Sequence, residues 1–181
     1  PFPTNSLRTA GFPGSRFLRS YAAGTNTAVM VFSGLPKHTK IGLGLLLAQL
    51  DSLDPLAEGE GFAIKVYGEE VLSVGLGPNQ GSEPQVATFK LFGSAVDVNT
   101  LKSTLTLGGQ DLFGCGGTVT YNDHVYDLSL LTGLQNIPHS GGTLVLEFTG
   151  IQNMGGENEG FGVDNVHLTV HPSKGTLIRL L

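Results

Sequence analysis

The sequence predicts an all-β fold, a two-sheet antiparallel β-sandwich of the jelly-roll type. About a dozen short apolar runs alternate with period 2, glycine-containing turns separate them, and no long helix is convincing. Hydrophobic residues make up 40% of the 181-residue chain and charged residues 14%, a balance that is typical of a folded globule. A chain of this length is most simply one domain.

Along its length the chain divides into three parts. Residues 1–15 are rich in Pro, Gly, Ser and Asn and predict an extended arm. Residues 16–171 form the predicted β-sandwich domain, and residues 172–181 a C-terminal strand or tail. The candidate strands in the first half are 16–21, 27–32, 41–47, 62–67, 71–74, 86–92 and 95–98.

The sequence of the leucine-rich candidate strand 41–47 and the residues after it fits either a β-strand or an α-helix. Alternation of apolar residues with Gly42 and Gly44 favours a strand, whereas Leu46, Leu50 and Leu53 also fit one face of a helix. Glycine costs a helix roughly 1 kcal/mol at each position, so the strand is favoured.

The second half continues the pattern. Residues 118–121 and 124–130 flank Asn122-Asp123, a dipeptide that predicts a two-residue hairpin turn. Further candidate strands are 101–107, 143–149 and 176–181, together with the strand that ends at Val170.

That last strand contains an unusual acid. Val166, Leu168 and Val170 share one face by period-2 parity, and the same parity places Asp164 on their face. A carboxylate that enters a core is unfavourable unless something pairs with it. We therefore expect Asp164 to have a partner, either a cation or a buried arginine such as Arg16.

Calcium is the predicted cofactor, in a structural role. Ca²⁺ takes six to eight oxygen ligands, and glycine-rich acidic loops present carboxylates and carbonyls freely. The predicted metal-ligating residues are Asp164 and Glu159 near the last strand and Asp51, Asp54 and Glu60 in an earlier acidic loop. The alternative is that these loop acids face water and serve solubility.

Charge and motif content exclude several classes of function. A net charge of −5 and a pI near 5.4, with scattered basic residues, argue against a nucleic-acid partner. Cys115 is alone, which excludes an intramolecular disulfide, and no apolar run is long enough for a membrane span. Nucleophile-elbow, phosphate-loop and metalloprotease motifs are absent, so no catalytic residue is predicted.

The five histidines are expected on turns and strand surfaces without metal-ligand spacing; they are His38, His124, His139, His167 and His171. The chain starts at Pro1 without methionine, which suggests a processed product whose export signal has been removed. The predicted location is therefore secreted or at the extracellular surface.

Several motifs recur in a recognisable order. The first half contains Gly34-Leu35-Pro36-Lys37-His38-Thr39, then Leu50-Asp51-Ser52-Leu53-Asp54, then Phe62 to Gly68. The second half contains Pro138-His139-Ser140, Leu144 to Gly150, and Glu159-Gly160-Phe161-Gly162-Val163-Asp164-Asn165-Val166. This order resembles a family of secreted and surface jelly-roll domains with D-S-W-D-G-like and E-S-W-G-I-D-N-V-like motifs, related in appearance to carbohydrate-binding modules.

The resemblance covers roughly residues 16–72 and 117–170 and implies a fold and a structural calcium ion, with no reaction attached. Two departures from the family pattern concern aromatic residues. Leu53 and Phe161 stand where the family has tryptophan, and the chain has no tryptophan at all. A tryptophan platform for sugars is therefore not expected at these two positions.

We therefore predict a non-enzymatic, extracellular structural or adhesive module of a surface assembly, which self-associates or binds other surface proteins. The termini, residues 1–13 and 176–181, are candidates for pairing with a neighbouring sheet edge. The alternative is a carbohydrate-binding module, and the third possibility is a glycan-active enzyme. The aromatics available to bind a glycan are Tyr21, Tyr67, Tyr121, Tyr126 and Phe161.

Overall fold

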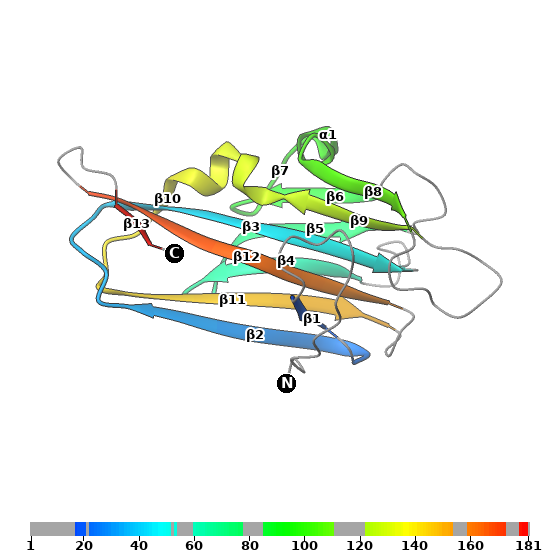
Figure 1. The fold of residues 1–181 in the computed structure, drawn as a ribbon, viewed down its shortest axis with the longest axis horizontal. Helices are drawn as coiled ribbons and strands as arrows, with labels where there is room; N and C mark the ends of the chain where they lie inside the picture. The colour runs from blue at the N-terminus through cyan, green and yellow to red at the C-terminus, as the bar shows by residue number, and fades with distance from the viewer. Residues whose placement is uncertain are drawn as a thin grey trace.

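The structure is a computed structural model that describes residues 17–20, 22–51, 53, 60–77, 85–110, 122–153, 159–172 and 178–180. These residues form two antiparallel sheets packed on one another (Figure 1). The predicted all-β, two-sheet sandwich is confirmed. No helix in these described ranges has the length and apolar character needed to cross a membrane.

One sheet has seven strands in the order β1-β12-β3-β9-β8, with β10 beside β3 and β13 beside β12. Two long strands, β3 and β12, form its centre and pair along most of their length. The strands are β1 (Leu18–Arg19), β3 (Lys40–Asp51), β8 (Leu105–Gln110), β9 (Asp123–Asp127), β10 (Ile137–Pro138), β12 (Glu159–His171) and β13 (Ile178–Leu180).

The other sheet has six strands in the order β2-β11-β4-β5-β6-β7. Its strands are β2 (Gly24–Ser33), β4 (Gly61–Val66), β5 (Glu69–Leu76), β6 (Val86–Leu91), β7 (Ser94–Ala95) and β11 (Thr143–Gln152). One edge is the ten-residue strand β2, and the opposite edge is the two-residue strand β7.

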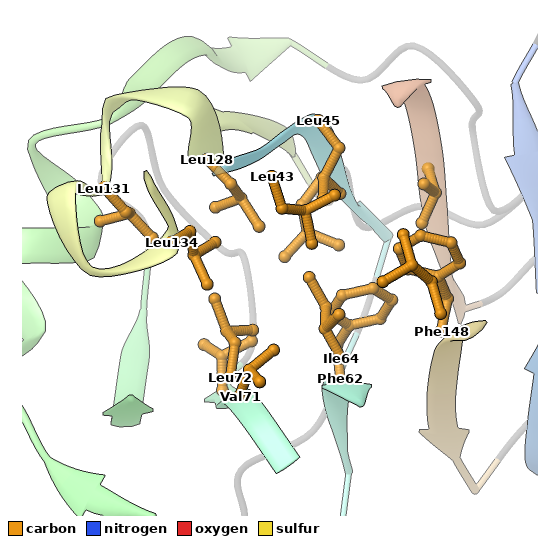
Figure 2. Packing of buried hydrophobic residues seen from close by; sticks show 14 of the residues in the cluster. Leu43, Leu45, Phe62, Ile64, Val71, Leu72, Leu128, Leu131, Leu134 and Phe148 are labelled. Carbon is orange, nitrogen blue, oxygen red and sulfur yellow. The ribbon is translucent and has the colours of Figure 1, made fainter. Parts of the chain in front are cut away.

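The main core lies between the two sheets. Alternate residues of each sheet point into it, for example Leu43 and Leu45 of β3 against Phe62 and Ile64 of β4 (Figure 2). Full burial of such a side chain stabilises the folded state by about 1.5–3 kcal/mol relative to leaving it exposed.

A second, smaller apolar cluster explains why the sequence of β3 is compatible with both a strand and a helix. Leu46, Ala48 and Leu50 of β3 lie on the outer face of the sheet, where Phe17 and Val125 bury them. Both faces of β3 are therefore apolar, which produces a nearly continuous hydrophobic run. Such a run loses the simple alternation of a strand with one solvent-exposed face.

Short helices replace two predicted strand segments. The helix α1 (Val98–Lys102) begins after Asp97, whose side chain accepts a hydrogen bond from the Asn99 amide at 2.9 Å. This N-cap favours a helix where strands 95–98 and 101–107 were predicted, so β7 ends at residue 95 and β8 begins at residue 105.

The predicted strand 124–130 is also shorter than expected. It ends at Asp127 and continues as the 3₁₀-helices η2 (Leu128–Leu130) and η3 (Thr132–Asn136). Leu128, Leu131 and Leu134 recur every three residues and are buried, as the three-residue turn of this helix requires (Figure 2). Asp123 belongs to strand β9 and not to a turn, while residues 118–121 lie outside the described residues.

Candidate functional site

At one end of the sandwich the backbones of two of the predicted acids lie side by side. Asp51 ends β3 and Glu159 begins β12, and the two residues are direct register partners. Glu60 immediately precedes β4 in the other sheet, is 1% exposed, and accepts a hydrogen bond from the Asn153 amide at 2.7 Å. Asp54 lies outside the described residues. The condition for a site shared by the two acidic segments, that they adjoin, is met by the backbones at Asp51 and Glu159.

Asp164 does not join this group. It lies five residues beyond Glu159 along β12, opposite Leu46, which is roughly 16 Å at a strand rise of ~3.3 Å per residue. One ion cannot be ligated by both Asp164 and the Asp51–Glu159 pair across that distance. Among the residues that the structure describes, no group of three or more His, Cys, Asp or Glu side chains has metal-binding geometry.

The face predicted for Asp164 is wrong because of a β-bulge. Asn165 has a left-handed φ of 50°, and the register with β3 shifts between Asp164 and His167. The extra residue reverses the parity of the strand. Leu168 therefore faces the main core, whereas Asp164 shares the outer face of the sheet with its partner Leu46.

The Asp164 carboxyl is half-buried and only partly hydrogen-bonded. Its Oδ1 accepts a hydrogen bond from the Asn165 amide at 2.7 Å, while its Oδ2 is buried without a hydrogen-bond partner among the described residues. Burial raises the pKa of this carboxyl, and the smaller effect of the Asn165 amide lowers it. Arg16, the predicted alternative partner, lies outside the described residues.

Buried hydrogen bonds join the two sheets near the acidic end. The Ser20 hydroxyl follows β1 in one sheet and donates to Gln152 Oε1 of the other sheet at 2.7 Å. Ser20 Oγ in turn accepts a hydrogen bond from the Phe161 amide at 2.9 Å. These groups are buried and satisfy one another, so we assign them a structural role.

A second buried link has the same role. Gln49 of β3 donates through Nε2 to the Gly77 carbonyl beyond β5, at 2.9 Å. The Tyr126 hydroxyl donates to Gln49 Oε1 at 3.1 Å, and burial raises the pKa of Tyr126. The phenol therefore stays neutral and acts as a hydrogen-bond donor.

The aromatic side chains are distributed differently from the sequence prediction. Tyr126 and Phe161 are buried, so neither is available to bind a glycan. Leu53 and Phe161, at the two tryptophan positions of the resembled family, both belong to the core. Tyr67 is 51% exposed, and Phe92, which was not among the candidates, is 46% exposed.

Two of the histidines form a pair that their sequence positions did not suggest. His38 is 2% exposed, and its Nε2 lies 2.5 Å from Nδ1 of His139, a residue 101 positions away. His124, on strand β9, is also buried, so the expectation of a turn or strand-surface position is wrong for His124, whereas His38 does lie in a turn. The spacing of the two histidines in the sequence did not indicate the pair. The pair forms because two separate turns meet at the end of the sandwich opposite Asp51.

The long edge strand β2 presents apolar side chains to solvent. Val29 is 60% exposed and Val31 is 59% exposed, whereas Met30 and Phe32 pack against the core. The strand pairs with β11 on one side, and no strand pairs with its other side in the described part of the chain.

No family model matches the chain, and neither the curated proteins nor the solved structures contain a match. The family resemblance drawn from the motifs accordingly stays a prediction.

Proposed function

We propose that this protein is a non-enzymatic structural or adhesive module of an extracellular surface assembly, and that it self-associates through the edge strand β2. The observation that carries the proposal is the character of that edge. β2 is ten residues long, contains no charged residue, and exposes Val29 and Val31. A long, apolar, unpaired edge is a template for pairing with another strand.

Soluble proteins usually protect such an edge with charges, prolines or a short strand. The opposite edge of the same sheet follows that rule, because β7 has only two residues. Charges on the outer face begin at the neighbouring strands, where Glu147 of β11 lies between Val29 of β2 and Lys65 of β4. A second copy that docks on β2 therefore meets an uncharged strip, without like-charge repulsion between the two strands.

The C-terminal segment is used within the chain. Residues Ile178–Leu180 form β13 on β12 of the same chain, and residues 1–16, the predicted arm, lie outside the described residues. Among the described edge strands we choose β2 as the pairing surface, because it is long and exposes Val29 and Val31.

Sedimentation velocity over a range of concentrations tests this proposal. We expect the wild-type protein to self-associate, and the double variant Val29→Lys/Val31→Lys to remain monomeric because its edge carries charge. Leu130→Lys is the matched control, since Leu130 is equally exposed, at 60%, but lies on η2 away from the edge. A monomeric wild-type protein at high concentration, or equal association of both variants, would refute the proposal.

Carbohydrate binding is the second candidate, favoured by two exposed aromatics on neighbouring turns. Tyr67 and Phe92 begin two-residue turns at the same end of the six-stranded sheet, each with a positive φ, 52° and 50°. Large residues rarely adopt this conformation, and strain of this kind often accompanies a binding role. A glycan array that shows no binding by the wild-type protein, or binding that Tyr67→Ala and Phe92→Ala leave unchanged, would remove this candidate.

A further inference from the structure

The histidine pair ties together three segments at the end of the sandwich opposite Asp51. His38 lies in the turn between β2 and β3, and its Nδ1 lies 2.6 Å from the Pro36 carbonyl oxygen. Its Nε2 lies 2.5 Å from His139 Nδ1, and His139 Nε2 lies 3.0 Å from the Thr143 carbonyl oxygen. The Tyr67 hydroxyl of the β4–β5 turn donates to the same Thr143 carbonyl.

The two imidazole rings meet edge to edge. Their planes differ by 17° and their centroids are 4.8 Å apart, whereas the facing nitrogens are only 2.5 Å apart. The nitrogens therefore lie between the ring centres, close to the line that joins them. A ring N–H lies in the ring plane, so this arrangement points a hydrogen of one ring at the lone pair of the other.

Counting hydrogens defines the protonation state of the pair. The Pro36 and Thr143 carbonyls only accept, so each of the two outer nitrogens needs a hydrogen. A neutral imidazole carries one N–H, so two neutral rings have none left for the inner contact. Two cationic rings would place two hydrogens between nitrogens 2.5 Å apart. A total of three hydrogens satisfies every contact.

We propose that His38 and His139 form a proton-binding clasp that holds one shared proton and a single positive charge, and that fastens the β2–β3 turn to the start of β11. This proposal does not depend on the function proposed above. Thr143 is the first residue of β11 and the register partner of Ser33, the last residue of β2. Protonation of the pair thus determines how firmly the end of the edge strand is held.

Other ionisable residues occur on the segments around the pair. These residues are Lys37, Lys40, Tyr67, Glu69 and His171. Burial and then repulsion from His38 lower the pKa of His139, and the hydrogen bond with Thr143 opposes them. No carboxylate among the described residues contributes to this shift, so none of these residues supplies an anion to support a second positive charge.

The sign of the pH dependence follows from the protons bound in each state. Below the unfolded histidine pKa of ~6.5, the unfolded chain binds a second proton that the folded pair rejects, so stability falls as the pH drops. Above it, the folded pair keeps one proton that the unfolded chain releases, so stability falls as the pH rises. The contribution of the clasp to the stability of the folded protein is therefore greatest near pH ~6.5.

Nitrogen-15 NMR of the wild-type protein with labelled histidine tests the proton count directly. At the pH of maximum stability we expect three ring N–H groups on the pair, one of them a strongly deshielded proton shared by His38 Nε2 and His139 Nδ1. Two N–H groups, which indicate neutral rings, or four, which indicate two cations, would each overturn the clasp. This measurement requires no substitution.

Thermal unfolding across pH provides the matched comparison. The wild-type unfolding constant should increase by up to about tenfold per pH unit on either side of the optimum, as expected for one proton. His139→Phe should flatten this profile, and His167→Phe should not. His167 is the control because it contacts a carbonyl, that of Asn165 at 3.1 Å, but no second imidazole. A profile that His139→Phe leaves unchanged would reject the clasp.

Discussion

Asp164 lies directly opposite Leu46 on the outer face of the central strand pair, with its buried Oδ2 lacking a hydrogen-bond partner among the described residues. An ionised carboxylate beside a leucine is unfavourable when it is incompletely hydrated. The β-bulge at Asn165 produces this arrangement and keeps the acid out of the main core.

Asp164→Asn should increase the free energy of unfolding at pH 7. In the folded protein burial raises the pKa of this carboxyl above its usual value of 3.8, so the folded state binds its proton at a higher pH than the unfolded chain. The penalty is therefore present above the folded pKa and disappears as the pH falls towards 3.8. Urea unfolding of both proteins between pH 7 and pH 4 measures the difference. A less stable variant at pH 7 would indicate that the carboxylate has a cationic partner.

Gly61→Ala should destabilise the protein by about 1–3 kcal/mol. A Cβ at this position would lie 2.8 Å from the Val74 carbonyl oxygen of the neighbouring strand, a backbone atom that cannot move aside. Gly142→Ala is the control, because a Cβ there meets nothing within 4 Å. Denaturant unfolding compares the two, and equal stabilities would show that β4 and β5 are less closely paired than described.

Ser20→Ala should lower the free energy of unfolding by about 1–3 kcal/mol. The substitution removes the hydroxyl that bridges Gln152 and the Phe161 amide in a buried position between the sheets. Ser140→Ala is the matched control on an exposed turn. The difference between their unfolding free energies isolates the buried bridge, and a loss below about 0.5 kcal/mol at Ser20 would mean that the bridge is unimportant.

Calcium binding is now proposed for the end of the sandwich where Asp51 and Glu159 pair. Roughly millimolar calcium should raise the melting temperature, since a ligand that binds only the folded state stabilises it. Asp51→Asn should abolish this shift, whereas Asp164→Asn should preserve it because Asp164 lies on another part of β12. An identical melting temperature in calcium and in chelator would rule out a structural calcium ion.

Sequence patterns predicted the sandwich because alternation and glycine turns act locally. The strand assignment of the leucine-rich run is observed, as β3 (Lys40–Asp51). The bulge at Asn165 escaped prediction, because a single residue with a left-handed φ reverses parity without changing the apolar pattern. Parity alone therefore assigned Asp164 to the wrong face.

The candidate sites were harder to predict because they depend on long-range pairing. The backbones at Asp51 and Glu159, one from each acidic segment, are neighbours only because β3 and β12 pair, while the shared calcium site stays a prediction. His38 and His139 are 101 residues apart, and only the meeting of two turns places their rings in contact. Exposure of Val29 and Val31 likewise depends on β2 being an edge, which one strand's sequence does not reveal.

Amide hydrogen exchange of β2 as a function of protein concentration tests the proposed assembly most directly. In an edge strand alternate amides point away from the sheet and exchange with water, and pairing with a second copy would protect them. We predict that protection of these amides in residues 24–33 increases with protein concentration and is lost in Val29→Lys/Val31→Lys. Rapid exchange of the same amides at every concentration, in a protein that nevertheless self-associates, would contradict it.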